Sequence, residues 1–115
     1  MFNARTFRPA RDSSPYSEEA ERMSRDITDL TCEGRFLRDE ACRLVVWFSR
    51  NSATEAQTYF VAERDKLRAS AAKWKTAIEA RGLKTAKILD QIFQPTFGCE
   101  FAQDVVRAAR AELEI

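Results

Sequence analysis

The stretch from Ala53 to Arg81 contains neither glycine nor proline, and this feature most constrains what the chain can fold into. An apolar stripe runs along it with near-heptad spacing, which is typical of one face of a helix. The stripe consists of Ala53, Ala56, Phe60, Leu67, Ala71, Trp74 and Ile78. The pattern therefore predicts one helix over residues 53–81, spanning roughly 43 Å at 1.5 Å per residue.

Local signals mark both ends of this helix. Ser52 and Glu55 have the spacing of a capping box, in which each side chain accepts a hydrogen bond from a free backbone N–H group of the first turn. Gly82 followed by Leu83 is the pattern of a Schellman ending, because glycine adopts the left-handed conformation at low cost. We therefore expect this helix to be the long central element of the fold.

Further helices are predicted on both sides of it. The apolar periodicity indicates helices over about 15–32, 35–50, 84–94 and 99–113. Pro15 suits a first helical position, and Gly34 is a plausible terminator between the first two helices. Residues 1–13 are basic and lack periodicity, which predicts a flexible arm. The fold class is therefore all-α: a single domain over residues 14–115, formed by a compact bundle of about five helices around the long one.

The apolar stripes also predict the core. The helix over 35–50 is apolar almost all round, so we expect it to be the most buried. The predicted core residues are Met23, Ile27, Leu30, Leu37, Leu44, Phe48, Phe60, Leu67, Ile88, Ile92, Val105 and Ala109.

The composition argues against an enzyme. The chain has no histidine, which excludes Ser-His-Asp and Cys-His nucleophile pairs and the commonest metal ligand. It has no glycine-rich phosphate loop. The carboxylate pairs Asp26/Asp29 and Glu100/Asp104 are interpreted as solvated helix faces. We therefore expect no catalytic residue, no metal and no cofactor.

The cysteines and the apolar runs bear on the compartment. Cys32, Cys42 and Cys99 are odd in number and form no Cys-x-x-Cys pair, so we expect reduced thiols that pack as small hydrophobic side chains. No apolar run reaches the length of a membrane span, and the N-terminus lacks the apolar region of a secretory signal. These features predict a cytoplasmic protein without membrane association.

Charge is segregated along the chain. Residues 17–33 hold six acids and two bases, a net charge of −4. Residues 63–87 hold eight bases and three acids, a net of +5, and residues 90–115 hold five acids and two bases, a net of −3. In one interpretation the acidic helices pack beside the basic one and opposite charges pair. In the other, the basic face is exposed and binds an acidic partner.

The second interpretation predicts a non-enzymatic protein-binding module that uses its basic face to contact a protein with an acidic surface. It would be an adaptor or inhibitor of the small kind that mobile elements often encode. The candidate partner-binding residues are Arg64, Arg68, Lys73, Trp74, Lys75, Arg81 and Trp47. Trp74 also belongs to the apolar stripe and so competes for a core position, whereas Trp47 lies off the main apolar face.

Two alternatives stay open. Residues 75–93 resemble the order of a helix-turn-helix, with a glycine turn before a short helix. In that case the chain is a DNA-binding regulator that contacts nucleic acid through Lys84, Thr85 and Lys87. Alternatively, the long stripe pairs with a second copy and the chain is a self-assembling helical subunit, a homodimer in the simplest case.

Overall fold

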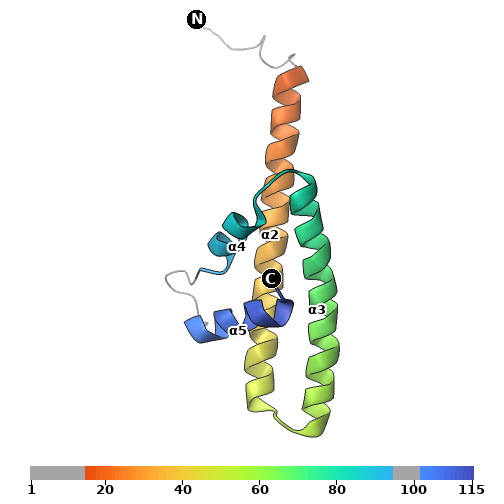
Figure 1. The fold of residues 1–115 in the computed structure, drawn as a ribbon, viewed down its shortest axis with the longest axis vertical. Coiled ribbons are helices and arrows are strands. Elements are labelled where there is room, and N and C mark those ends of the chain that lie inside the picture. The colour runs from red at the N-terminus through yellow and green to blue at the C-terminus, as the bar shows by residue number, and fades with distance from the viewer. Residues whose placement is uncertain (1–14, 95–101) are drawn as a thin grey trace, which may run out of the picture.

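The computed structural model describes residues 15–94 and 102–115, with side chains from residue 17 onward. These residues form four helices and no strand: α2 (Pro15–Arg50), α3 (Thr54–Ala80), α4 (Thr85–Ile92) and α5 (Gln103–Leu113) (Figure 1). The predicted all-helical fold is confirmed. The predicted arm over 1–13 and the residues Pro95, Cys99 and Glu100 lie outside the described part.

The predicted break at Gly34 is wrong. Helix α2 runs unbroken for 36 residues, so it replaces two of the predicted helices and exceeds α3, which has 27. Gly34 is buried in the middle of α2. A Cβ atom at this position would lie 2.5 Å from Cδ1 of Ile92 and 2.7 Å from Cζ2 of Trp74. Gly34 therefore allows α3 and α4 to approach the backbone of α2 closely, and it does not end the helix.

The long α3 helix is confirmed to within one residue at each end. The glycine ending is also confirmed: Gly82 has φ +72°, the Gly82 N–H donates to the Glu79 carbonyl at 3.0 Å, and the Leu83 N–H donates to the Ile78 carbonyl at 3.3 Å. These are the two hydrogen bonds of a Schellman motif. The capping box is wrong, because the N-cap residue is Ala53 and no side chain caps this end.

Helices α2 and α3 form an antiparallel hairpin, and α4 and α5 pack on one side of it (Figure 1). Helix α2 packs against α4 and α5 more extensively than α3 does, so α2 is the central element and not α3 as predicted. Arg38 on α2 donates to the Ile92 carbonyl at 2.7 Å, which satisfies a carbonyl group at the end of α4. None of the described helices is both long and apolar enough to cross a membrane.

The core lies where the four helices meet. Its buried residues are Leu30, Leu37, Ala41, Cys42, Ala71, Trp74, Ile78, Leu89, Ile92, Phe93, Val106, Ala109 and Leu113. Near the hairpin turn, the rings of Phe48 and Phe60 are 4.4 Å apart. Two predicted core residues are exposed instead: Met23 is 55% exposed and Ile27 is 38% exposed. Phe36, on the helix that we expected to be most buried, is 61% exposed.

The molecule is elongated, about 69 × 30 × 20 Å, and this differs from the predicted compact bundle. Its radius of gyration is 19.6 Å, against about 13 Å for a compact domain of 100 residues. Figure 1 shows the cause: the N-terminal part of α2 projects past the turn that joins α3 to α4. We call the projecting residues 17–29 the α2 extension.

Candidate partner-binding surface

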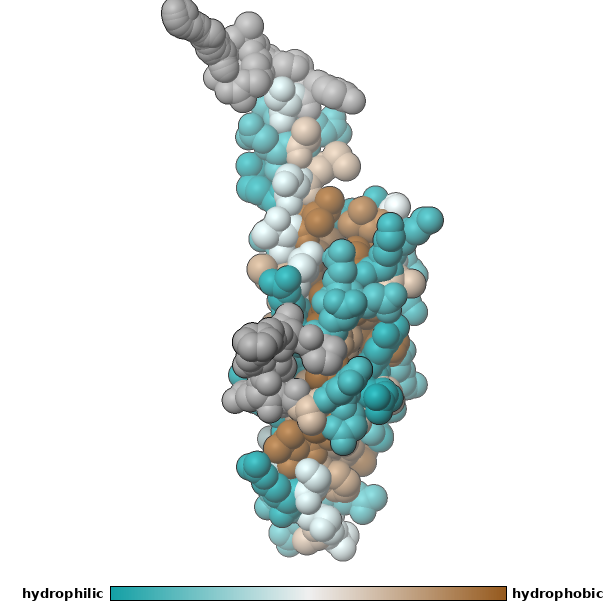
Figure 2. Space-filling view, turned by 90° about the vertical axis from the view of Figure 1, so that its left-hand side faces the viewer, coloured by the Kyte–Doolittle hydropathy of each residue, from teal (hydrophilic) through white to brown (hydrophobic). Residues whose placement is uncertain are grey.

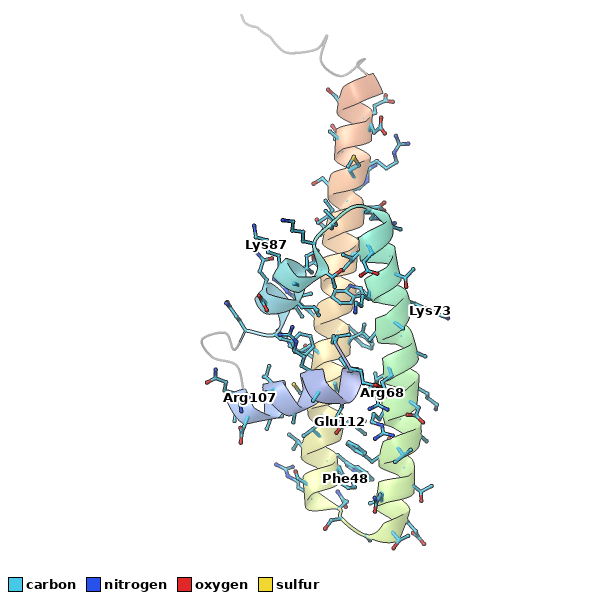
Figure 3. All side chains as sticks on the ribbon, viewed as in Figure 1. Phe48, Arg68, Lys73, Lys87, Arg107 and Glu112 are labelled. Carbon is cyan, nitrogen blue, oxygen red and sulfur yellow. The ribbon has the colours of Figure 1, made fainter. Side chains whose placement is uncertain are left out.

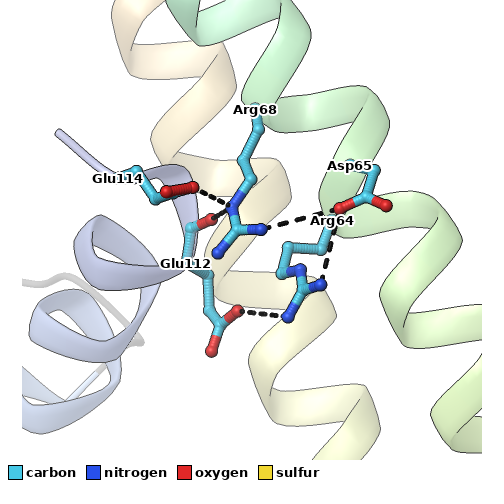
Figure 4. A network of polar contacts seen from close by, with 5 residues as sticks. All are labelled: Arg64, Asp65, Arg68, Glu112 and Glu114. Atoms are coloured by element: carbon cyan, nitrogen blue, oxygen red, sulfur yellow. Dashed lines mark hydrogen bonds and ion pairs between the residues drawn. The ribbon is translucent and has the colours of Figure 1, made fainter.

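Two of the predicted partner-binding arginines hold α5 against α3. Nε of Arg68 donates to the Glu112 carbonyl at 2.7 Å and lies 3.1 Å from Oε2 of Glu114 (Figure 4). Arg64 pairs with the carboxylate of Glu112 at 3.7 Å, and Asp65 lies within 3.6 Å of both arginines. Both arginine side chains are half-buried. In this part of the chain the acidic and basic helices pair, as the first of the two charge interpretations predicts.

A third arginine, Arg81, connects α3 to the acidic N-terminal part of α2. Arg81, the C-cap residue of α3, lies 3.2 Å from Oδ2 of Asp26 on the α2 extension and also donates to the Ala77 carbonyl at 2.8 Å. This contact marks the level at which α3 stops along α2. Beyond it, the extension has no neighbour among the described residues.

The predicted lysines are placed differently. Lys73, Lys84 and Lys87 are exposed, Lys75 is half-buried, and none pairs with an acid of the described residues. Lys73 points outward from α3, while Lys87 points outward from α4 on the other side of the hairpin (Figure 3). The structure therefore divides the predicted basic face into paired arginines and dispersed lysines.

The segment with the helix-turn-helix pattern forms a turn and the eight-residue α4. Lys84 is the N-cap residue, and Thr85, which begins the helix, is half-buried. Leu89 and Ile92 attach α4 to the core. Lys84 and Lys87 are the exposed cations at the start of α4, and DNA contact by these residues stays a prediction.

The two tryptophans have different environments. Trp74 is 2% exposed, and its indole N–H donates to the Leu30 carbonyl at 2.6 Å, so it joins α3 to α2 from within the core. Trp47 is half-buried, and its ring packs edge-on against Tyr59 with the ring centroids 4.6 Å apart. These two rings line an open depression beside the hairpin turn, together with Arg50, Asn51 and Glu55.

The α2 extension has an exposed apolar surface that was not predicted from the sequence, which placed Met23 and Ile27 in the core. The stripe on α2 that faces the core follows a heptad without a change of phase. One row is Ala20, Ile27, Gly34, Ala41 and Phe48, and the other is Met23, Leu30, Leu37 and Leu44. The rows are covered from Leu30 onward but exposed at Met23 and Ile27. In Figure 2, apolar surface continues from the body along the extension, beside hydrophilic surface.

The borders of this stripe differ in charge. The position next to the first row is acidic in four consecutive heptads, at Glu19, Asp26, Glu33 and Glu40. On the other border, Ser17, Ser24 and Thr31 are uncharged. Asp26 pairs with Arg81 and Glu40 with Arg43, whereas Glu19 and Glu33 are exposed and pair with no described residue. The extension therefore presents an apolar stripe with one acidic edge.

No chemical centre emerges from the described residues. They contain no group of three or more cysteine, aspartate or glutamate side chains that could hold a metal ion. Asp26, one of the carboxylates considered in the sequence, is paired with Arg81. Cys42 is buried and Cys32 is exposed, so of the two cysteines that the structure describes only Cys42 packs as a small hydrophobic side chain.

Comparison of the chain with protein family models, with curated proteins and with solved structures finds no match.

Proposed function

We propose that this chain is a non-enzymatic helical module that binds another protein, and that the α2 extension is its contact surface. The observation that carries the proposal is the exposure of Met23 and Ile27 on the same stripe whose later residues, from Leu30 onward, are buried in the core. A helix in a globular protein gains most of its stability by burying its apolar face against a neighbour. Beyond the pair of Asp26 with Arg81, the extension has the apolar face but no neighbour among the described residues.

The predicted basic face gives weaker support for partner binding. Arg64, Arg68 and Arg81 already pair with acids of the same chain, and a partner would have to displace those contacts. The lysines that remain do not form one patch with an aromatic centre, because Trp74 is buried. Hot spots of interfaces are typically apolar or aromatic side chains at the centre of a patch, and exposed charges at the rim contribute less.

The proposal is tested by matched variants in a pull-down with the full chain as bait. Met23→Glu introduces a charge into the stripe, whereas Thr28→Glu introduces the same charge on the extension roughly 140° around the helix. Both side chains are exposed, so both variants should fold like the wild type. We expect Met23→Glu to lose the bound protein and Thr28→Glu to retain it.

If both variants retain the same partner, the extension is not the contact surface. The variant Lys73→Glu/Lys75→Glu then tests the basic face of α3. In the wild type these two lysines form no ion pair with the described residues. Reversing their charge therefore leaves the ion pairs of the arginines with α5 and α2 intact.

The DNA-binding alternative depends on Lys84 and Lys87, the exposed cations at the start of α4. A labelled duplex retained at low ionic strength and released by salt would support it, provided that Lys84→Gln/Lys87→Gln abolishes the retention.

A further inference from the structure

The chemistry of the α2 extension indicates what kind of partner it binds. We propose that the extension binds an amphipathic helix of another protein, whose apolar stripe is bordered by lysine or arginine side chains. This inference rests on the proposed function and adds the structure and charge of the partner.

The intramolecular packing supports a helical occupant. The surface formed by Met23 and Ile27 continues the surface formed by Leu30, Gly34 and Leu37, where a helix already packs. Both parts follow the same heptad, so they present the same spacing of side chains to whatever lies on them. A helix placed along the extension would continue the direction of α3 beyond Arg81.

Charge complementarity supports a basic border on that helix. Positions that flank the apolar seam of paired helices form the ion pairs that select the partner. Asp26 occupies such a position and is paired with Arg81, a cation supplied by the neighbouring helix. Glu19, one heptad earlier, is exposed and has no such cation among the described residues.

The same charges disfavour a second copy of this chain as the occupant. Residues 17–29 hold five acids and two bases, a net charge of −3, so two extensions repel each other. A partner with cations along its edge is attracted instead. Such steering raises the association rate and weakens with salt.

The test uses two synthetic helical peptides as probes and the full chain as target. Both peptides carry the same leucine stripe at heptad spacing, and they differ only in bearing lysine or glutamate along its borders. We expect the lysine-bordered peptide to bind at least tenfold more tightly at low ionic strength, measured by fluorescence anisotropy, and the difference to shrink as salt is added.

Paired variants locate the binding. Met23→Gln/Ile27→Gln should abolish binding of the lysine-bordered peptide, whereas Thr28→Gln, which places a glutamine on the extension outside the stripe and its borders, should retain it. Glu19→Gln should weaken binding about twofold to fivefold, which corresponds to one exposed ion pair. Glu18→Gln, which removes the same charge from the outer side of the helix, should not.

The outcomes separate the two proposals. Equal binding of both peptides, lost in Met23→Gln/Ile27→Gln, would overturn the basic border and leave the extension as a protein-binding surface. Binding of neither peptide by a chain that sediments as a monomer would overturn both proposals. A dimer in sedimentation that Met23→Gln/Ile27→Gln dissociates would make a second copy the occupant and overturn this inference.

Discussion

Replacing Gly34 with alanine tests the packing that joins α2 to the rest of the molecule. The added Cβ would lie 2.5 Å from Cδ1 of Ile92 and within 3.0 Å of two ring atoms of Trp74. The end of an isoleucine side chain can move, but the indole ring is 2% exposed and is held by its hydrogen bond to the Leu30 carbonyl. The substitution therefore forces a buried ring, or a whole helix, to shift.

Two opposing effects set the magnitude. Alanine in a helix interior is favoured over glycine by about 1 kcal/mol. Overpacking a core costs about 1–3 kcal/mol, and the rigid ring places this site in the upper part of that range. We therefore expect Gly34→Ala to lower the free energy of unfolding by about 1–2 kcal/mol, measured by urea denaturation followed by circular dichroism.

A double-mutant cycle identifies the cause. Ile92→Val removes Cδ1, the atom nearest to the added methyl group, and by itself costs about 0.5–1.5 kcal/mol. In the Gly34→Ala background it should cost at least about 0.5 kcal/mol less, because it relieves the overlap. The reasoning is refuted if Gly34→Ala raises the free energy of unfolding by about 1 kcal/mol, as it would at an open helical position.

Three further predictions concern the other contacts that hold α3 in place, each measured by urea denaturation. Gly82→Ala should cost about 1 kcal/mol, because φ is +72° and the Cβ strains this conformation although nothing lies within 4 Å of it; an unchanged midpoint would contradict this. Trp74→Phe should cost about 2 kcal/mol through the lost indole hydrogen bond and the smaller ring, and a loss below about 0.5 kcal/mol would show that the Leu30 contact is unimportant. Arg68→Met should cost about 1 kcal/mol, because this partly exposed arginine donates a hydrogen bond to the Glu112 carbonyl. The control Lys73→Met, at an exposed lysine, should stay within about 0.5 kcal/mol of the wild type. Equal effects of the two variants would mean that the contact of Arg68 with α5 adds no stability.

The elements that could be predicted from the sequence are those with local causes. The absence of glycine and proline between Ala53 and Arg81, together with the apolar period, located α3 to within one residue at each end. Gly82 and Leu83 predicted the Schellman ending, because its geometry depends on a few adjacent residues.

The same kind of reasoning failed at Gly34. A glycine after a polar stretch has two possible roles, as a helix ending or as a site of close packing. The heptad through Met23, Leu30, Leu37 and Leu44 keeps its phase across Gly34, and this was the signal in the sequence that favours an unbroken helix. Whether Ile92 and Trp74 come close enough to require a glycine depends on contacts between segments far apart in the chain.

The sequence by itself determined that this chain is helical and where its amphipathic stripes run, because hydrophobic period and backbone preference act over a few residues. Only the tertiary structure decided which parts of each stripe are covered. Leu30 and Met23 lie on the same row of α2, yet one is buried and the other exposed, because α3 ends at the level of Asp26. The ion pairs were decided in the same way: Arg64 and Arg68 bind α5 because the fold brings Glu112 and Glu114 to them, and Lys73 has no such neighbour among the described residues.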